Sequence, residues 1–531
     1  MRLATLTLAA LLGASPAMAQ TGGVITAEEL GARLRLLASD AFEGRYPGTR
    51  GETLTTSYLV SELQSFGVRP GMPDGGWLQQ VAIVLHDPDP ASPNEARLSG
   101  RVAGALEFGR DIRFRNYSEA AEVNAGGELV FVGHGIRAPM YGWDDLAGVD
   151  LRGKVAVALM AEPTISEDTA MFNGARASRF SWPLDRIAEM DRRGAAGVLW
   201  LIPAAGFRSP GGGIRRLRGE ANPEGVRFAG SISDSAVAAL LPSGAGSLDS
   251  LLRAAGRRGF RALPLGVRLD VRLRTRPRTL VTHNVVGVVS GTDRARRDEH
   301  LVLSAHWDAY GIGPAVNGDS IYNGALDDGS GTTTLLALAR VFARAPQPRS
   351  LTFLFTTSEE LGLLGAEAFV RAGPLPMNRV VANLNLDDGT ELFGRKRDVA
   401  PLGIELSSLG RTVDRVAARM GLRVSPDPFP EEGFFLRADN YPFARAGVPS
   451  LYMALGTDGE KHGKAWVDAK VKEYLAHHYH RPSDDFATVV LDLDGAKQYA
   501  DFVRAVAIAV ASDRAKPEWN PHGEFARPGT R

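Results

Sequence analysis

Apolar runs that alternate with amphipathic segments dominate the second half of the chain. Strand-like apolar runs occupy 284–291, 300–306, 350–355 and 380–387, and a helical pattern covers about 332–345. Runs without polar alternation are typical of strands buried on both faces, and helices between such strands predict parallel connections. The pattern therefore predicts an α/β fold with a mainly parallel mixed sheet flanked by helices, in which functional residues gather at the carboxyl ends of strands.

The rest of the chain has different patterns of apolar residues. Residues 26–70 carry two helical patterns separated by a glycine-rich loop, and 493–512 carry one more. Short valine-rich strands prevail in a separate β-rich insertion, which also contains a helix-like stretch over 184–201. We expect a signal peptide at 1–19, the N-terminal part of the main domain at 20–104, the insertion at 105–265, the main domain again at 266–515, and a polar tail at 516–531 that frays.

Composition and the first residues narrow the classes of function. The chain has 61 Lys plus Arg against 61 Asp plus Glu, so no net field draws it toward nucleic acid or anionic lipid. Residues 1–19 combine an early positive charge, a short apolar stretch and the small-x-small pattern Ala17-Met18-Ala19, which is typical of a cleaved secretory signal. That stretch is too short for a membrane span. We therefore expect an exported protein, periplasmic or secreted, that begins near Gln20.

Residues with metal-ligand chemistry follow the predicted strands. The chain contains no cysteine, so histidine, aspartate and glutamate are the side chains available for a metal site. His306 and Asp308 are alternate residues of an extended segment, and the carboxylate can therefore orient the imidazole. The other candidates are Asp327 in a glycine-rich loop, the adjacent Glu359 and Glu360, Asp387 at the end of a strand, and His480 in the loop before Pro482.

Each candidate alone is weak evidence, because Asp327 suits a helix cap and adjacent glutamates suit the first turn of a helix. Together, two imidazoles and three carboxylates provide what a pair of zinc ions needs, with one carboxylate bridging. One glutamate of the adjacent pair can then bind metal while its neighbour, directed elsewhere by one residue of chain, moves protons.

The motifs HWD, NGALDDGSG, SEELGLLGA, NLNLDD and YHRPSDD, in this order, resemble the aminopeptidase Y family of di-zinc exopeptidases, which includes glutamate carboxypeptidase relatives. The resemblance covers about residues 280–515. LLASDAFEGR also resembles the family's N-terminal helix region. FVGHGIRAP, VDLRGKVAVALM and AEMDRRGAAGVLWL resemble the protease-associated domain that many members carry as an insertion.

Carried over by motif, the resemblance implies a role for each candidate. His306 and Asp387 bind one zinc, Glu360 and His480 bind the other, and Asp327 bridges them. Glu359 is then the general base, Asp308 the acid that holds the first histidine, and Asp484 a support for His480. The segment FFLRADN departs from the family's Arg-Ser-Asp-His at Ala438 and Asn440, which concerns substrate contacts rather than metals.

The function implied is an exported aminopeptidase with two Zn²⁺ per chain, which cleaves N-terminal residues from peptides with a free amino terminus through a bridging water activated by Glu359. One alternative is a carboxypeptidase, for which Arg437 or Arg481 would bind the terminal carboxylate. A second is a glutaminyl-cyclase-like acyltransferase with one zinc, and a third is a non-catalytic relative that binds peptides or partners. The intact Glu359 and the complete ligand set favour hydrolysis.

Several neighbours are interpreted as structural. We interpret Asp328 and Asp388 as turn residues that bind nearby backbone amides. His477 and His478 are expected to face solvent. The aromatic residues of the segment after 430, namely Phe434, Phe435 and Tyr441, are expected to be packed rather than to line a side-chain pocket.

Overall fold

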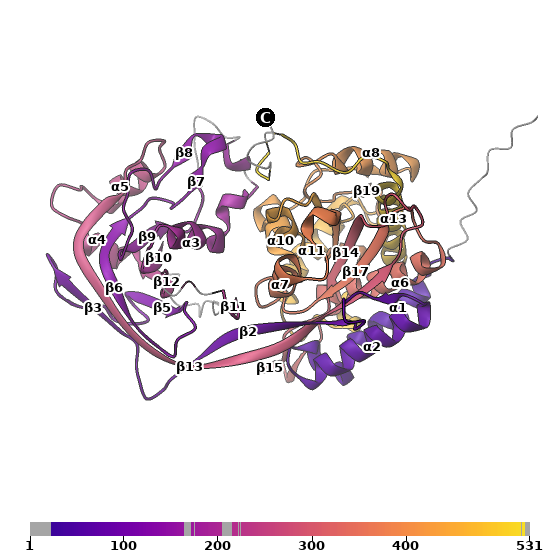
Figure 1. Cartoon of the computed structure of the whole chain (residues 1–531), viewed down its shortest axis with the longest axis horizontal. Coiled ribbons are helices and arrows are strands. Elements are labelled where there is room, and N and C mark those ends of the chain that lie inside the picture. The colour runs from indigo at the N-terminus through magenta and orange to yellow at the C-terminus, as the bar shows by residue number, and fades with distance from the viewer. Residues whose placement is uncertain are drawn as a thin grey trace, which may run out of the picture.

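The computed structural model describes residues 23–163, 171–174, 176–203, 215–220, 222, 225–521 and 523–525; the expected signal peptide lies outside them. The chain forms two lobes joined by two long paired strands, β2 (Leu78–Pro88) and β13 (Leu263–Val289) (Figure 1). The lobe that carries the five motifs is called the motif lobe, and the other the inserted lobe. No helix in the described ranges is long and apolar enough to cross a membrane.

The sheet of the motif lobe follows the order β21-β18-β14-β17-β13. β14 (His300–His306) pairs in parallel with β17 (Ser350–Thr356) and β18 (Val380–Leu386), and β21 (Ser450–Met453) is parallel to β18. β13 runs antiparallel to β17 and pairs on its other side with β2. The predicted α/β fold with a mainly parallel mixed sheet is confirmed.

Helices cover both faces of this sheet, as the apolar runs predict. Leu301 and Leu303 of β14 pack in one core and Val302 packs in another, because successive side chains of a strand point to opposite faces. The first face carries α1 (Ala27–Leu37), α2 (Arg50–Phe66), α6 (Ser330–Arg344) and α13 (Leu493–Ser512), and the second carries α7 (Leu364–Ala372) and α10 (Asn440–Arg445). α8 (Leu409–Arg419), α11 (Lys464–His477) and α12 (Phe486–Val489) also contribute to the first core. Elsewhere in the lobe lie α9 (Phe434–Arg437) and the hairpin β15 (Gly311–Val316) and β16 (Asp319–Tyr322).

The inserted lobe is built on a second sheet, in the order β13-β6-β9-β10-β12-β5. Its four central strands are parallel to one another: β6 (Glu122–Phe131), β9 (Val155–Leu159), β10 (Gly197–Ile202) and β12 (Phe228–Ser233). β5 (Ile112–Asn116) and β3 (Glu95–Gly100) run antiparallel to their partners, and α3 (Pro183–Arg192), α4 (Asp234–Leu240) and α5 (Leu248–Ala255) complete the lobe.

The helix-like stretch predicted over 184–201 divides into a helix and a strand. α3 ends at Arg192, and the chain turns at Gly194, which has a φ of 78° that glycine adopts without strain. The apolar residues that follow form β10, whose Val198 and Leu199 pack on opposite faces of the sheet. The prediction of one continuous helical stretch was therefore wrong for its second half.

The segment near the C-terminus packs between the two lobes (Figure 1). Phe525 stacks on Trp519, with ring centroids 5.0 Å apart, and it is 4% exposed. Glu524 Oε2 accepts a hydrogen bond of 2.8 Å from the backbone N–H of Arg179 in the inserted lobe. The expectation of a frayed tail is therefore wrong for these residues, because their apolar rings and the carboxylate find partners far away in the sequence.

Candidate metal centre

Five predicted ligands converge at the carboxyl ends of the parallel strands. Two of them are at strand ends, since His306 is the last residue of β14 and Asp387 directly follows β18. The fold rule that ligands gather at this edge of an α/β sheet accounts for the convergence. The others come from connections: Asp327 from the turn η6 (Ala325–Gly329) before α6, Glu360 from the loop after β17, and His480 from the loop after α11.

Asp327 lies between the two imidazoles. Its Oδ1 is 3.0 Å from His306 Nε2, and its Oδ2 is 3.2 Å from His480 Nε2. On one side Asp387 Oδ1 is 3.6 Å from His306 Nε2, and on the other Glu360 Oε2 is 3.3 Å from His480 Nε2. The arrangement is two pairs of one histidine and one carboxylate, which share Asp327.

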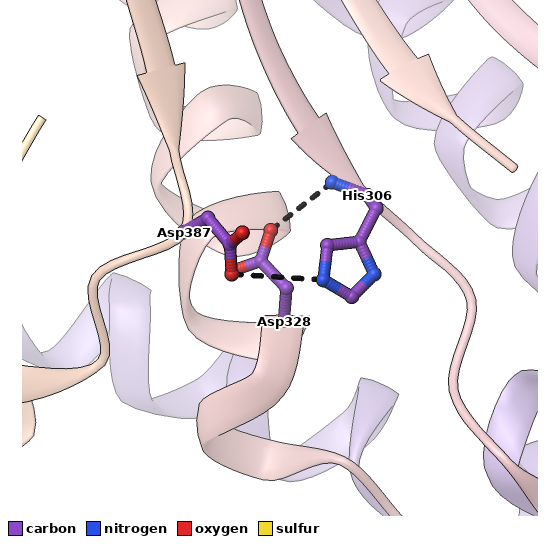
Figure 2. A group of neighbouring side chains, drawn as sticks. All are labelled: His306, Asp328 and Asp387. Carbon is purple, nitrogen blue, oxygen red and sulfur yellow. Dashed lines mark hydrogen bonds and ion pairs between the residues drawn. The ribbon is translucent and has the colours of Figure 1, made fainter. Parts of the chain in front are cut away.

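Asp328 lies next to His306 and Asp387, but its carboxylate has different partners (Figure 2). Asp387 points at the imidazole of His306, whereas Asp328 Oδ2 accepts a hydrogen bond of 3.1 Å from the backbone N–H of His306. The other oxygen of Asp328 accepts from Gly331 N at 2.9 Å. Its carboxylate therefore binds backbone amides, as the interpretation of Asp328 as a turn residue requires. Asp388 likewise accepts from Leu455 N at 3.0 Å.

Hydrogen bonds hold the imidazole of His306 and the turn that carries the glutamates. His306 Nδ1 donates to the backbone carbonyl of Asp308 at 3.0 Å, while the nearer carboxylate oxygen of Asp308 is 3.8 Å away. That oxygen, Oδ1, accepts from the backbone N–H of Glu359 at 3.2 Å. Asp308 thus contacts the first histidine through its main chain and positions Glu359 through its side chain.

The second histidine is supported by residues that the sequence analysis missed. His480 Nδ1 lies 3.0 Å from the hydroxyl of Tyr310, and its ring stacks on Tyr479 at 3.6 Å between centroids. The expectation that Asp484 supports His480 was wrong, because Asp484 accepts from Leu326 N at 2.9 Å and from Asp327 N at 3.2 Å. Asp484 therefore holds the loop of Asp327. A tyrosine near a motif gives no periodic signal, so no pattern could have identified these partners.

The cluster contains more acidic than basic groups, and this shifts their pKa values. Burial raises the pKa of Glu360 well above its usual range, and the carboxylates of Asp327 and Glu359 raise it further. For His306, burial lowers the pKa, but Glu359 and the hydrogen bonds to Asp327 and Asp387 outweigh it and raise the pKa well above normal. The carboxylates therefore outnumber the cationic groups in a buried site, a condition that bound cations relieve.

The donor atoms fit divalent metal ions. The ligand atoms of Asp327, Glu360 and His480 all lie within 4.8 Å of one another. Those of His306 and Asp387 lie equally close together, beside Asp328, whose oxygens already accept from backbone amides. His480 Nε2 is buried, makes no hydrogen bond to another described residue, and faces two carboxylates. Imidazole nitrogen and carboxylate oxygen without thiolate are ligands of zinc in catalytic rather than structural sites.

A cavity opens beside the cluster. Asp327, Glu359 and Asp387 line one part of it, and the rest is largely apolar, with Phe393, Leu402, Phe429, Phe434, Tyr452 and Val471. The expectation for the aromatic segment is thus wrong for Phe434 and agrees with the buried packing of Phe435 and Tyr441. Arg437 also lines the cavity, where its Nη2 donates to the Tyr479 hydroxyl at 3.1 Å.

Comparison with known proteins finds peptidases that are similar to parts of this chain. A segment of Bacillus subtilis aminopeptidase YwaD is 23% identical over 245 residues, which is 45% of this chain and 46% of that protein. The probable leucine aminopeptidase 2 of Aspergillus oryzae is 30% identical over 122 residues, 23% of this chain and 22% of that protein. The matched segments thus span less than half of either relative.

The fold and the family profile agree with these relatives. The solved aminopeptidase from Aneurinibacillus sp. strain AM-1 superimposes with a TM-score of 0.50 at 18% identity, over 93% of this chain and 96% of that one, which is a likeness of fold. Residues 284–507, which include all five predicted ligands and Glu359, match the profile of peptidase family M28. This segment is therefore similar to peptidase family M28, which confirms the kinship that the motifs indicate.

Proposed function

We propose that the protein is a zinc-dependent metallo-exopeptidase and, more narrowly, a di-zinc aminopeptidase that removes N-terminal residues from peptides. The observation that carries the proposal is Asp327, which lines a largely apolar cavity and whose two oxygens face His306 and His480. His306 and Asp387 would hold one ion, Glu360 and His480 the other, and Asp327 would contact both. When bound, zinc polarises a substrate carbonyl and makes water more acidic.

The remaining chemistry belongs to Glu359. Its carboxylate lines the cavity and makes no hydrogen bond to another described residue, so both oxygens are available to water or substrate. Burial raises the pKa of Glu359 well above its usual range, and this makes it a stronger proton acceptor than an exposed glutamate. Glu359 would take a proton from the attacking water and deliver it to the amine that leaves.

Charge supports recognition of a free amino terminus. A protonated α-amine would be attracted by the carboxylates of Glu359 and Asp387 at the edge of the cavity. A carboxypeptidase is the second candidate, because Arg437 lines the same cavity and could pair with a terminal carboxylate. We further propose export by residues 1–19 and a protease-associated character for the inserted lobe, on the resemblance of their sequences alone.

One peptide supplied in three forms tests which terminus of the substrate the protein recognises. The forms are free at both ends, N-acetylated and C-amidated, and cleavage is followed by mass spectrometry. Acetylation should abolish cleavage because it removes the positive charge, and amidation should leave it intact. The reverse pattern would replace the aminopeptidase by the carboxypeptidase. A wild-type content near one zinc ion per chain would favour the cyclase-like alternative.

A further inference from the structure

Arg45, the last residue of the motif LLASDAFEGR, is buried against the two segments that carry His306 and Asp327. It lies in η1 (Asp40–Arg45) between α1 and α2, and it is 1% exposed. Its guanidinium donates to backbone carbonyls: Nε to Trp307 at 2.8 Å, Nη1 to Asn323 at 2.6 Å and to Leu37 at 3.0 Å, and Nη2 to Gly324 at 2.8 Å. All three guanidinium nitrogens are thus in use.

These carbonyls belong to the two segments that present metal ligands. Trp307 directly follows His306, and Gly324 directly precedes η6, three positions before Asp327. One rigid, planar group therefore joins the end of β14 to the turn before α6.

The charge of Arg45 interacts with the acids of the centre, although it forms no direct ion pair with them. No carboxylate among the described residues lies within ion-pair distance of it, yet Asp484, Asp328, Asp308 and Asp327 all raise its pKa against the dominant lowering by burial. The cation is thus held by carbonyls and interacts electrostatically with the acids of the centre. Such a position offsets negative charge without occupying a ligand.

The backbone around Arg45 is strained, and its surroundings leave no room for change. Glu43 and Arg45 have φ values of 52° and 50°, in the left-handed region that is unfavourable for residues other than glycine. A Cβ on Gly44 would meet the carbonyl oxygen of Tyr322 at 2.5 Å and that of Gly311 at 2.7 Å. Strain of this kind persists when the surrounding contacts fix the conformation, and here they place the guanidinium against the segments that carry His306 and Asp327.

We propose that Arg45 is a positioning residue of the metal centre, which sets the spacing between His306 and Asp327 and offsets part of the carboxylate charge. The inference rests on the proposed function in one respect, since it is tested by the binding of zinc. It assigns a role to an N-terminal segment that lies outside the matched family profile, 262 residues before Trp307.

Two substitutions and a matched control test the proposal. Arg45→Met keeps most of the side-chain length and removes both charge and donors, while Arg45→Lys keeps the charge but not the fork. Arg186→Met is the control, because Arg186 is 3% exposed and also donates to the carbonyls of four residues, but in the inserted lobe. Zinc dissociation constants are measured by competition with a chelator, and folding by circular dichroism and thermal unfolding.

We expect Arg45→Met to weaken zinc binding by roughly 10- to 100-fold, as loss of outer-shell support typically does, and Arg45→Lys to recover part of the affinity. Arg186→Met should lower thermal stability and leave zinc affinity unchanged. If Arg45→Met does not fold, Arg45→Lys decides: weakened zinc binding supports the proposal, and wild-type affinity overturns it. Wild-type affinity in both Arg45 variants would also overturn it, whereas a wild-type protein that binds no zinc would refute the proposed function instead.

Discussion

Replacement of Glu359 and Glu360 one at a time should separate catalysis from metal binding. Glu359 forms no ion pair with either imidazole, whereas Glu360 Oε2 lies 3.3 Å from His480 Nε2. Glu359→Gln keeps the shape of the side chain but cannot accept a proton. Loss of a general base costs roughly 10²- to 10⁴-fold in rate, or about 2.7 to 5.4 kcal/mol of barrier.

The two variants should therefore differ in what they lose. Glu359→Gln should bind zinc as the wild type does and hydrolyse peptides at least about 100-fold more slowly. Glu360→Gln should lose one ion, with a weakening of affinity larger than the roughly 10- to 100-fold expected when a residue that only supports a ligand is lost. Elemental analysis after dialysis gives the metal content, and hydrolysis of an aminoacyl anilide under saturating zinc gives the rate.

Glu367→Gln serves as the control in both assays. Glu367 lies in α7, pairs with Arg371 at 2.7 Å, and has no place in the centre, so rate and zinc content should not change. Equal loss of zinc in Glu359→Gln and Glu360→Gln would refute the division of labour between them. Full activity in Glu359→Gln would refute its role as the base.

Three further predictions concern the metal, the lobes and pH. Wild-type protein should contain two zinc ions per chain, and the variants His480→Ala and Asp387→Ala should contain fewer. Equal zinc contents of all three proteins in elemental analysis would contradict the ligand assignment. Phe525→Ala should lower stability by up to about 3–5 kcal/mol and increase protease cleavage between the lobes, because a buried aromatic contact is lost; an unchanged melting temperature would contradict its packing. Burial lowers the pKa of His134 to about 4, so folding stability should fall as pH drops from about 6.5 toward 4, by at most about 3 kcal/mol. Denaturant unfolding of His134→Gln at pH 7 and pH 4.5 should show a smaller fall, and an equal fall would contradict the assignment.

The parts of the fold that follow from periodicity could be predicted from the sequence. The strand at His300–His306 and the helix at Leu493–Ser512 have the predicted bounds, because each is an uninterrupted pattern that ends at a strong signal. The candidate ligands could be predicted because five acid or histidine side chains lie at strand ends or in motif loops. The division of α3 from β10 was missed, since an apolar run after a glycine turn suits a strand and a helix equally well.

The supporting residues could not be predicted because they act over long distances in the sequence. Arg45 bonds to Trp307, and Tyr310 lies beside His480 across 170 residues. Asp484 was given the wrong partner because it is close in sequence to His480, while in space its oxygens reach the amide of Asp327. Sequence patterns report the period of an element, and they carry no information on which distant loops meet.

β13 is 27 residues long, and its length limits where the chain can be cut to delete or exchange the inserted lobe. β13 pairs with β2 from Val285 back to Thr275, and then with β3 and β6 in the other sheet. A deletion that removes the inserted lobe must cut a hydrogen-bonded strand rather than a loop, and the cut would leave open strand edges, which promote aggregation. Chimeras that exchange this lobe between proteins should therefore keep the β2–β13 ribbon intact and join the donor lobe beyond Pro88 and before Thr275.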